Sequence, residues 1–90
     1  MGYLFRWNEW NQTHIAAHDV APEEAEFVIG NARAPFPRAV ADDRFLVVGQ
    51  TEAGTYIQVV YIFDPPGVVF VIHARPLTDR EKRRFRRGRK

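Results

Sequence analysis

His73 and Arg75 are residues of the types that cleave a phosphodiester bond without a metal. Metal-independent cleavage of RNA needs a base for the 2′-hydroxyl proton, an acid for the leaving oxygen and a cation for the charge on the phosphate. Histidine suits the first two roles because its charge changes near neutral pH, whereas arginine stays charged and grips phosphate. Side chains alternate along a strand, so both are expected on one face, across one phosphate. The alternatives are a histidine packed against the core and a surface arginine that bridges its strand to the following helix.

His14 and His18 lie four residues apart, the spacing that places two zinc ligands on one face of a helix. The residues between them include no glutamate to act as a base, and the chain has no cysteine to complete a coordination sphere. We therefore expect no metal and no cofactor. His14 is expected to pack, and His18 to lie at a helix C-terminus, where the dipole favours a cation. Participation of His18 in catalysis is the alternative.

An α+β domain with the order β-α-α-β-β-β-α is predicted to position these residues. The three later strands are rich in β-branched and aromatic residues and have short connections, which predicts an antiparallel sheet. Residues 32–42 contain two prolines and several small side chains and are predicted to form a loop. The expected strands are 3–7, 44–49, 55–63 and 68–74, and the expected helices are 9–18, 22–29 and 79–87.

Capping residues indicate where the three helices begin. Asn8 suits the N-cap of the first helix, and Pro22, which lacks an N–H, suits the first turn of the second. Thr78 and Glu81 have the spacing of a capping box at the start of the last helix, which is basic. Trp10, in the first helix, is expected in the core.

The 90 residues predict one domain over positions 1–90, and a hydrophobic content of 46% excludes a disordered chain. No targeting segment or membrane span is recognisable, so we expect a cytoplasmic protein with no membrane partner. Residues 75–90 carry nine basic and two acidic residues, whereas the rest of the chain carries four basic and nine acidic ones. This basic end predicts contact with an anion such as nucleic acid, or else a solvated tail that frays over residues 86–90. The arginines expected to bind RNA are Arg80, Arg83, Arg84, Arg86 and Arg87.

Three segments, in chain order, resemble the sequence pattern of BrnT-like proteins. The first comprises W-N-E at residues 7–9 and H-I-A-A-H-D-V-A-P-E-E-A at residues 14–25. The second is Arg44 followed by V-G-Q-T-E-A-G at residues 48–54, and the third is V-I-H-A-R-P at residues 71–76 with the basic run after it. The likeness covers nearly the whole chain. It departs from the family at a lysine and a glycine, which are Ala17 and Asp19 here.

The resemblance implies a RelE-like fold and the toxin half of a bacterial type II toxin–antitoxin pair. Such toxins cleave RNA without a metal, which blocks translation, and they are neutralised by a DNA-binding antitoxin of the BrnA kind, through which they also assemble. Carried over to this chain, the family's functional arginines correspond to Arg44 and Arg75, beside His73 and His18 as candidates for proton transfer. The alternative is a catalytically weak or inactive module that binds RNA, DNA or an antitoxin on the same fold, because the family's lysine is missing.

Overall fold

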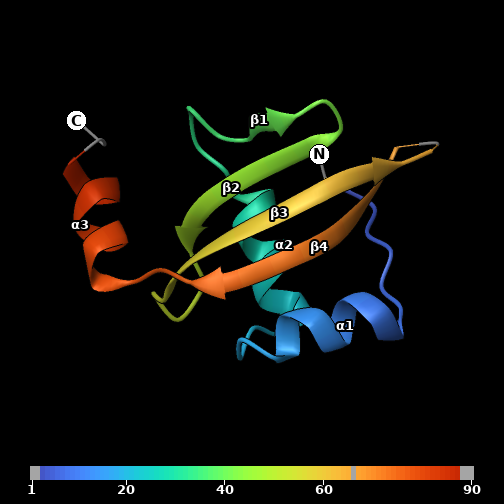
Figure 1. Ribbon diagram of the computed structural model, residues 1–90, viewed down its shortest axis with the longest axis horizontal. Coiled ribbons are helices and arrows are strands. Elements are labelled where there is room, and N and C mark those ends of the chain that lie inside the picture. The colour runs from blue at the N-terminus through green and yellow to red at the C-terminus, as the bar shows by residue number, and fades with distance from the viewer. Residues whose placement is uncertain (1–2, 66, 88–90) are drawn as a thin grey trace.

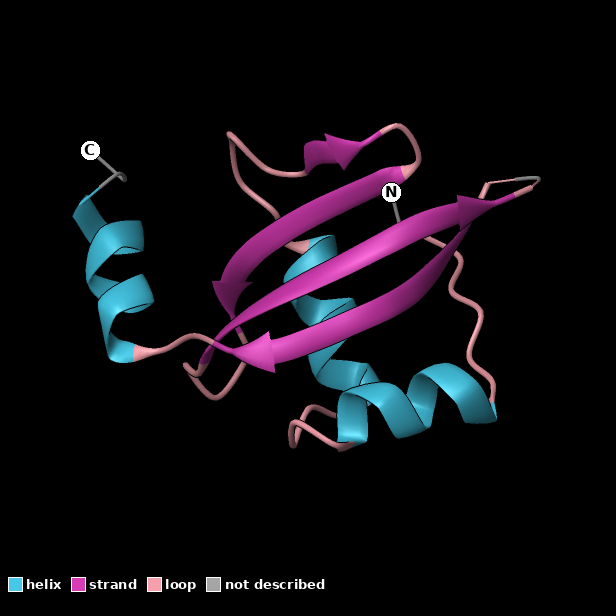
Figure 2. Ribbon diagram, in the orientation of Figure 1, coloured by secondary structure: helices cyan, strands magenta, loops and turns pink. Residues whose placement is uncertain are grey.

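Within residues 3–65 and 67–87, which the computed structural model describes, the chain forms one antiparallel sheet and three helices. The strands follow one another across the sheet in the order β1-β2-β3-β4. Helices α1 and α2 lie against one face of the sheet, and α3 stands beyond the end where β4 finishes (Figure 1, Figure 2). The elements are α1 (Glu9–Ala16), α2 (Pro22–Gly30), β1 (Arg38–Ala41), β2 (Arg44–Gln50), β3 (Tyr56–Asp64), β4 (Val68–Pro76) and α3 (Asp79–Arg87). The prediction of an α+β domain with an antiparallel sheet is therefore confirmed.

The helix starts are where their capping residues predict. The Asn8 side chain accepts a hydrogen bond from the Asn11 N–H at 3.1 Å, and the Asn11 side chain accepts one from the Asn8 N–H at 2.8 Å. Pro22 occupies the first turn of α2. At α3, the Thr78 hydroxyl accepts from the Glu81 N–H at 3.2 Å, and the Glu81 carboxylate accepts from the Thr78 N–H at 2.8 Å. These bonds satisfy N–H groups that the first turn of a helix leaves without partners.

The core lies between the two N-terminal helices and one face of the sheet. Tyr61 and Val59 on the central strand are almost fully buried, and Ile15 of α1 and Val28 of α2 pack over them. Burial raises the pKa of the Tyr61 hydroxyl to about 12. The buried cluster consists of Ile15, Val20, Ala25, Val28, Ile29, Val47, Ile57, Val59, Tyr61, Val69, Val71 and Ala74.

The predicted first strand over residues 3–7 is wrong. Only Phe5 pairs with the sheet, in an isolated parallel bridge to Val69 on β4. The Arg6 N–H donates to the Val69 carbonyl at 2.9 Å, and the Val69 N–H donates to the Leu4 carbonyl at 2.8 Å. Because the chain must turn away at Asn8 to start α1, too few residues remain beside β4 to extend this pairing. The order after the bridge is therefore α-α-β-β-β-β-α.

The interpretation of residues 32–42 as a loop is wrong for β1, which pairs antiparallel with β2. All four residues of this edge strand are exposed. An edge strand without a buried face shows no alternation of apolar and polar residues, and Pro35 and Pro37 directly before it indicate a loop. The first helix is also shorter than predicted, because it ends at Ala16 and the chain turns through Asp19 at a positive φ of 62°. No described helix is long and apolar enough to cross a membrane.

Candidate functional site

Helix α1 runs beside β4 in Figure 1, and this region contains the three histidines of the chain: His14 on α1, His18 just after it and His73 on β4. The His18 and His73 rings are 5.6 Å apart, centroid to centroid. His14 stacks on Trp10 at 3.9 Å, and Trp10 stacks on Phe70 of β4 at 6.0 Å. We call these five side chains the histidine edge. It consists of two imidazoles that can transfer protons and, next to them, an exposed aromatic surface.

Trp10 belongs to this surface and not to the core, contrary to the prediction. Its side chain is 49% exposed, and its ring lies between His14 and Phe70. In α1 the core contacts come from Asn11 and Ile15, the buried residues of that helix. The spacing of four between Trp10 and His14 could have predicted that the two side chains lie together, because residues four apart share one face of a helix.

A β-bulge at Ile72 places His73 and Arg75 on the open face of the sheet. Tyr61 pairs with Val71, but its neighbour Val60 pairs with His73, which leaves Ile72 as an extra residue. Without this residue, alternation from the buried Val71 would turn His73 and Arg75 toward the helices. The predicted shared face of His73 and Arg75 is confirmed by their partners on β3, which lie two residues apart. The bulge thus turns both side chains away from the helices, where they are partly exposed.

The surroundings of His73 keep its imidazole neutral. Burial lowers the pKa of His73 below its usual 6.5, and the nearby positive charges of His18, Arg75 and His14 lower this pKa further. A neutral imidazole has a free lone pair at neutral pH and can accept a proton. His18 is exposed and stands against it. The pair therefore combines a proton acceptor with a second titratable ring beside it.

Arg75 is bound to the last helix. Its Nη1 donates to Glu81 Oε1 at 2.9 Å and its Nη2 to Oε2 at 2.8 Å, and Nη1 also donates to the Pro76 carbonyl at 3.1 Å. This is the bridge between strand and helix that the sequence offered as one alternative. The Arg75 hydrogen bond is the main cause that lowers the pKa of Glu81 to about 2, and the Thr78 N–H contributes. Of the five guanidinium N–H groups, Nε–H and one on Nη2 keep no acceptor among residues 3–65 and 67–87.

Arg44 is not brought to this site. It begins β2, where its side chain is 56% exposed and its Nε lies 3.9 Å from an Asp43 carboxylate oxygen. Arg75 aligns through Gln58 with Val48, four residues further along β2. At about 3.3 Å per residue this separates the two arginines by roughly 13 Å along the strands alone. Arg44 and Arg75 therefore cannot hold one phosphate.

The basic helix α3 exposes its arginines, and no residue of it is buried. Arg86 lies over the Tyr56 ring at 5.3 Å, and α3 continues to Arg87. Residues 88–90 of the predicted tail lie outside the described residues. All five arginines that were expected from the sequence to bind RNA lie on this helix: Arg80, Arg83, Arg84, Arg86 and Arg87.

In the part of the chain that the structure describes, no group of three histidine or carboxylate side chains has the geometry to hold a metal ion. His14 instead bonds through Nδ1 to the Trp10 carbonyl at 3.1 Å. The sequence interpretation also missed Glu81 as the partner of Arg75, because the capping box already explained this glutamate. Its position six residues after Arg75, across Pro76 and the turn into α3, was the available signal.

Comparison with known proteins identifies no relative of this chain. No protein-family model matches the chain, and neither curated proteins nor solved structures include a match. The features that bear on function are therefore the histidine edge, Arg75 and the sequence motifs.

Proposed function

We propose that the protein is a metal-independent endoribonuclease of the toxin type, with its reaction at the histidine edge. The observation that carries this proposal is the contact between His18 and His73, whose rings are 5.6 Å apart beside Arg75. Two imidazoles next to a guanidinium can supply the base, the acid and the cation that cleavage of RNA by its own 2′-hydroxyl needs. The proposed cellular setting is a type II toxin–antitoxin pair with a BrnA-like antitoxin as the partner.

His73 is the base in this proposal. It takes the 2′-hydroxyl proton, the 2′-oxygen bonds to the adjacent phosphorus, and a 2′,3′-cyclic phosphate forms. His18 donates a proton to the 5′-oxygen that leaves. Arg75 has two N–H groups without an acceptor among the described residues. These groups stabilise the charge on the phosphate oxygens. The lowered pKa of His73 suits the base because its neutral form prevails at neutral pH.

The turn before α2 supports the resemblance to BrnT-like proteins. The family has glycine at the position of Asp19, and here Asp19 has a φ of 62°, in the left-handed region. Glycine adopts this conformation freely and aspartate tolerates it better than most residues do. The backbone at this position thus has the shape for which the family's glycine is suited.

A cleavage assay with purified protein and a short single-stranded RNA tests the proposal. His73→Gln and His18→Gln should each lower the rate by roughly 10²- to 10⁴-fold. His14→Gln is the matched control, because His14 belongs to the same edge but has no assigned proton-transfer role: its ring stacks on Trp10 and its Nδ1 bonds to the Trp10 carbonyl. The control should keep the rate within a few-fold. Equal rates for all three variants, with folding verified by circular dichroism, would overturn the assignment.

Growth of bacteria that express the protein tests the toxin setting. Wild type should slow growth and lower translation, and Arg75→Ala should relieve both effects. Arg44→Ala should remain toxic, because Arg44 lies at the other end of the sheet. Harmless wild-type protein would contradict the toxin proposal.

A second candidate function is an RNA-binding module that does not cleave. The two-bond ion pair between Arg75 and Glu81 favours it, because this carboxylate neutralises the cation that the reaction needs. The missing family lysine at Ala17 points the same way. Salt-dependent RNA binding without any cleavage, unchanged by His73→Gln, would select this function.

A further inference from the structure

A groove between the end of α2, the end of β2 and α3 shares no lining residue with the histidine edge. It consists of two hollows of about 300 Å³ and about 250 Å³, which have Phe36, Val48 and Phe85 in common. The larger volume is at the lower limit of small-molecule sites, so it suits one small planar group with a short attachment. We call it the arginine groove, after Arg33, which lines the larger hollow, and Arg38 and Arg84, which line the smaller one. The Arg38 guanidinium lies over the Phe36 ring at 5.6 Å.

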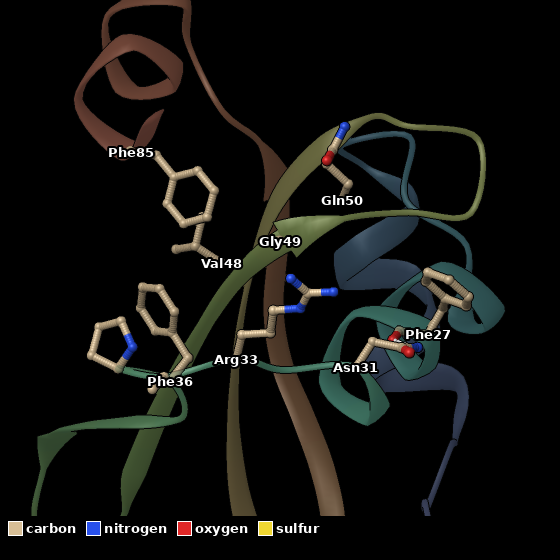
Figure 3. A pocket seen from close by; sticks show the side chains of 10 residues that line it. Phe27, Asn31, Arg33, Phe36, Val48, Gly49, Gln50 and Phe85 are labelled. Carbon is tan, nitrogen blue, oxygen red and sulfur yellow. Dashed lines mark hydrogen bonds between the residues drawn. The ribbon is translucent and has the colours of Figure 1, made fainter. Parts of the chain in front are cut away.

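The Arg33 side chain extends into the larger hollow, between Phe36 on one side and Asn31 on the other (Figure 3). In the described part of the chain no carboxylate lies within ion-pair distance of it, whereas Arg6 and Arg75 each meet an acid. A guanidinium keeps its charge at every physiological pH and matches the geometry of phosphate. The hollow therefore offers an uncompensated cation to an anionic group.

An aromatic wall faces this cation. The Phe36 and Phe85 rings are 6.2 Å apart, and Phe85 also meets Tyr56 at 5.8 Å. Phe36 belongs to the segment before β1 and is held by packing against the core. Rings of this kind are the surfaces on which the bases of single-stranded nucleic acid stack.

Two amide side chains complete the lining, Asn31 and Gln50. Asn31 Nδ2 donates to the Phe27 carbonyl at 2.8 Å, and Gln50 Nε2 donates to the Gly54 carbonyl at 3.1 Å. These bonds orient both amides so that their oxygens remain to accept. An exocyclic amino group of a base is a donor of the matching kind, and uracil has none.

The groove reaches the proposed reaction site through the smaller hollow. Glu81, the partner of Arg75, lines this hollow together with Gln58. Gln58 pairs with Arg75 on one side and with Val48 on the other, so groove and guanidinium share one row of the sheet. Two strand spacings amount to roughly 10 Å, which a single RNA strand crosses within a few nucleotides.

We propose that the arginine groove binds one nucleotide of single-stranded RNA near the scissile phosphate. The base stacks on Phe36 and Phe85, the phosphate meets Arg33, and the amide oxygens of Asn31 and Gln50 accept from an exocyclic amino group. The groove thereby sets which base flanks the cut, with cytosine preferred over uracil among the pyrimidines. This inference rests on the proposed function, because it takes RNA as the substrate.

Fluorescence anisotropy with a 2′-O-methyl hexacytidylate measures binding without cleavage, because this probe lacks the attacking hydroxyl. Phe36→Leu, which keeps the apolar bulk, should weaken binding roughly five- to 150-fold. Arg33→Ala should weaken it and reduce the slope of log affinity against log salt by about 0.7. The controls are Phe63→Leu and Arg6→Ala, an exposed ring and an arginine at the other end of the sheet. Both controls should bind within about twofold of wild type and keep its salt slope.

Wild-type affinity in Phe36→Leu and Arg33→Ala, both folded by circular dichroism, would overturn the inference. Equal affinity for hexacytidylate and hexauridylate would overturn the role of the amides. If wild type cleaves RNA while these variants bind normally, the inference fails and the proposed function stands. If Phe36 and Arg33 control binding but the protein never cleaves, the groove stands and the ribonuclease proposal fails.

Discussion

The histidine edge and the arginine groove differ in what sets their charge. The edge contains three imidazoles, and its central residue His73 has a lowered pKa. The positive charge of the groove comes from Arg33, Arg38 and Arg84, which remain cations at any physiological pH. Proton concentration therefore acts on the edge, and ionic strength acts on the groove. The proposed cleavage and the proposed binding should therefore respond to different changes of condition.

Low pH should reduce the cleavage rate at the histidine edge but leave the RNA affinity of the arginine groove unchanged. Because burial and the neighbouring cations lower the pKa of His73, cleavage should hold at pH 7 and fall about tenfold per pH unit below that lowered pKa. Binding of the 2′-O-methyl probe should not fall over this range. The measurement is the single-turnover rate between pH 4.5 and pH 8, together with the probe affinity. A rate and an affinity that fall in parallel would contradict the separation of the two regions.

The stability of the fold should depend on pH in the same direction. The unfolded chain binds a proton at His73 more readily than the folded chain, since folding lowers this pKa below 6.5. The free energy of unfolding should therefore decrease as pH falls below 6.5, until the folded pKa is passed. His73→Gln removes this contribution, so its unfolding midpoint in urea should depend less on pH in that window. An identical pH dependence in wild type and variant would contradict the assigned shift.

Deletion of residues 86–90 should weaken binding and spare the chemistry. The segment contains four basic residues, Arg86, Arg87, Arg89 and Lys90. If all four meet phosphates, the slope of log affinity against log salt should flatten by roughly two to three units. The cleavage rate at saturating RNA should stay near that of the full chain, because the histidine edge is untouched. An unchanged salt slope would show that these cations remain in solvent.

Glu81→Gln tests the link between the two regions, because Glu81 lines the groove and holds Arg75. The pKa of Glu81 is lowered to about 2, mainly by the Arg75 hydrogen bond. The stability that this pair contributes is present above the ordinary value of 4.5 and is lost as pH falls toward 2. Wild type should therefore unfold at a slightly higher temperature than Glu81→Gln at pH 6, and the difference should disappear near pH 2. At neutral pH the variant should also bind RNA more tightly, because Arg75 is no longer neutralised.

The smallest expected effect concerns the turn that holds His18. Asp19→Gly should raise the free energy of unfolding by less than about 1 kcal/mol, since relief of the left-handed conformation is offset by the entropy of glycine. Ala17→Lys adds a cation next to His18 in the sequence and, if the proposed function holds, should raise the cleavage rate a few-fold. Asp19→Ala is the control for the turn and should destabilise the fold. Greater stability of Asp19→Ala would contradict the backbone account.

The fold was predictable from residue 8 to residue 87 wherever one segment contains its own signal. Asn8, Pro22 and Thr78 mark helix starts because capping acts within one turn. The wrong predictions about strands concern pairing between distant segments. Whether residues 3–7 extend a strand depends on the room beside β4, and β1 has no buried face to produce a pattern.

The site was predictable in its residue types but not in its arrangement. His73 and Arg75 were correctly placed on one face, although the bulge at Ile72 that exposes this face depends on the register of β3. The contact of His18 with His73 joins residues 55 positions apart, which no local pattern contains. Arg33 escaped notice because its hollow is assembled from α2, the following loop, β2 and α3. Sites built from several segments require the folded chain.

Trp10 places a fluorescent side chain in the histidine edge. Its indole is 49% exposed and stacks on His14 at 3.9 Å, and a protonated imidazole at such a distance quenches tryptophan emission. The only other tryptophan, Trp7, is partly buried and bonded through Nε1 to Glu26 at 2.7 Å, so its emission should be less sensitive to solvent quenchers. The two fluorophores thus separate a local signal from a global one. RNA that covers the edge should shield Trp10 from iodide and leave Trp7 as an internal standard, so the chain contains its own optical probe of substrate arrival.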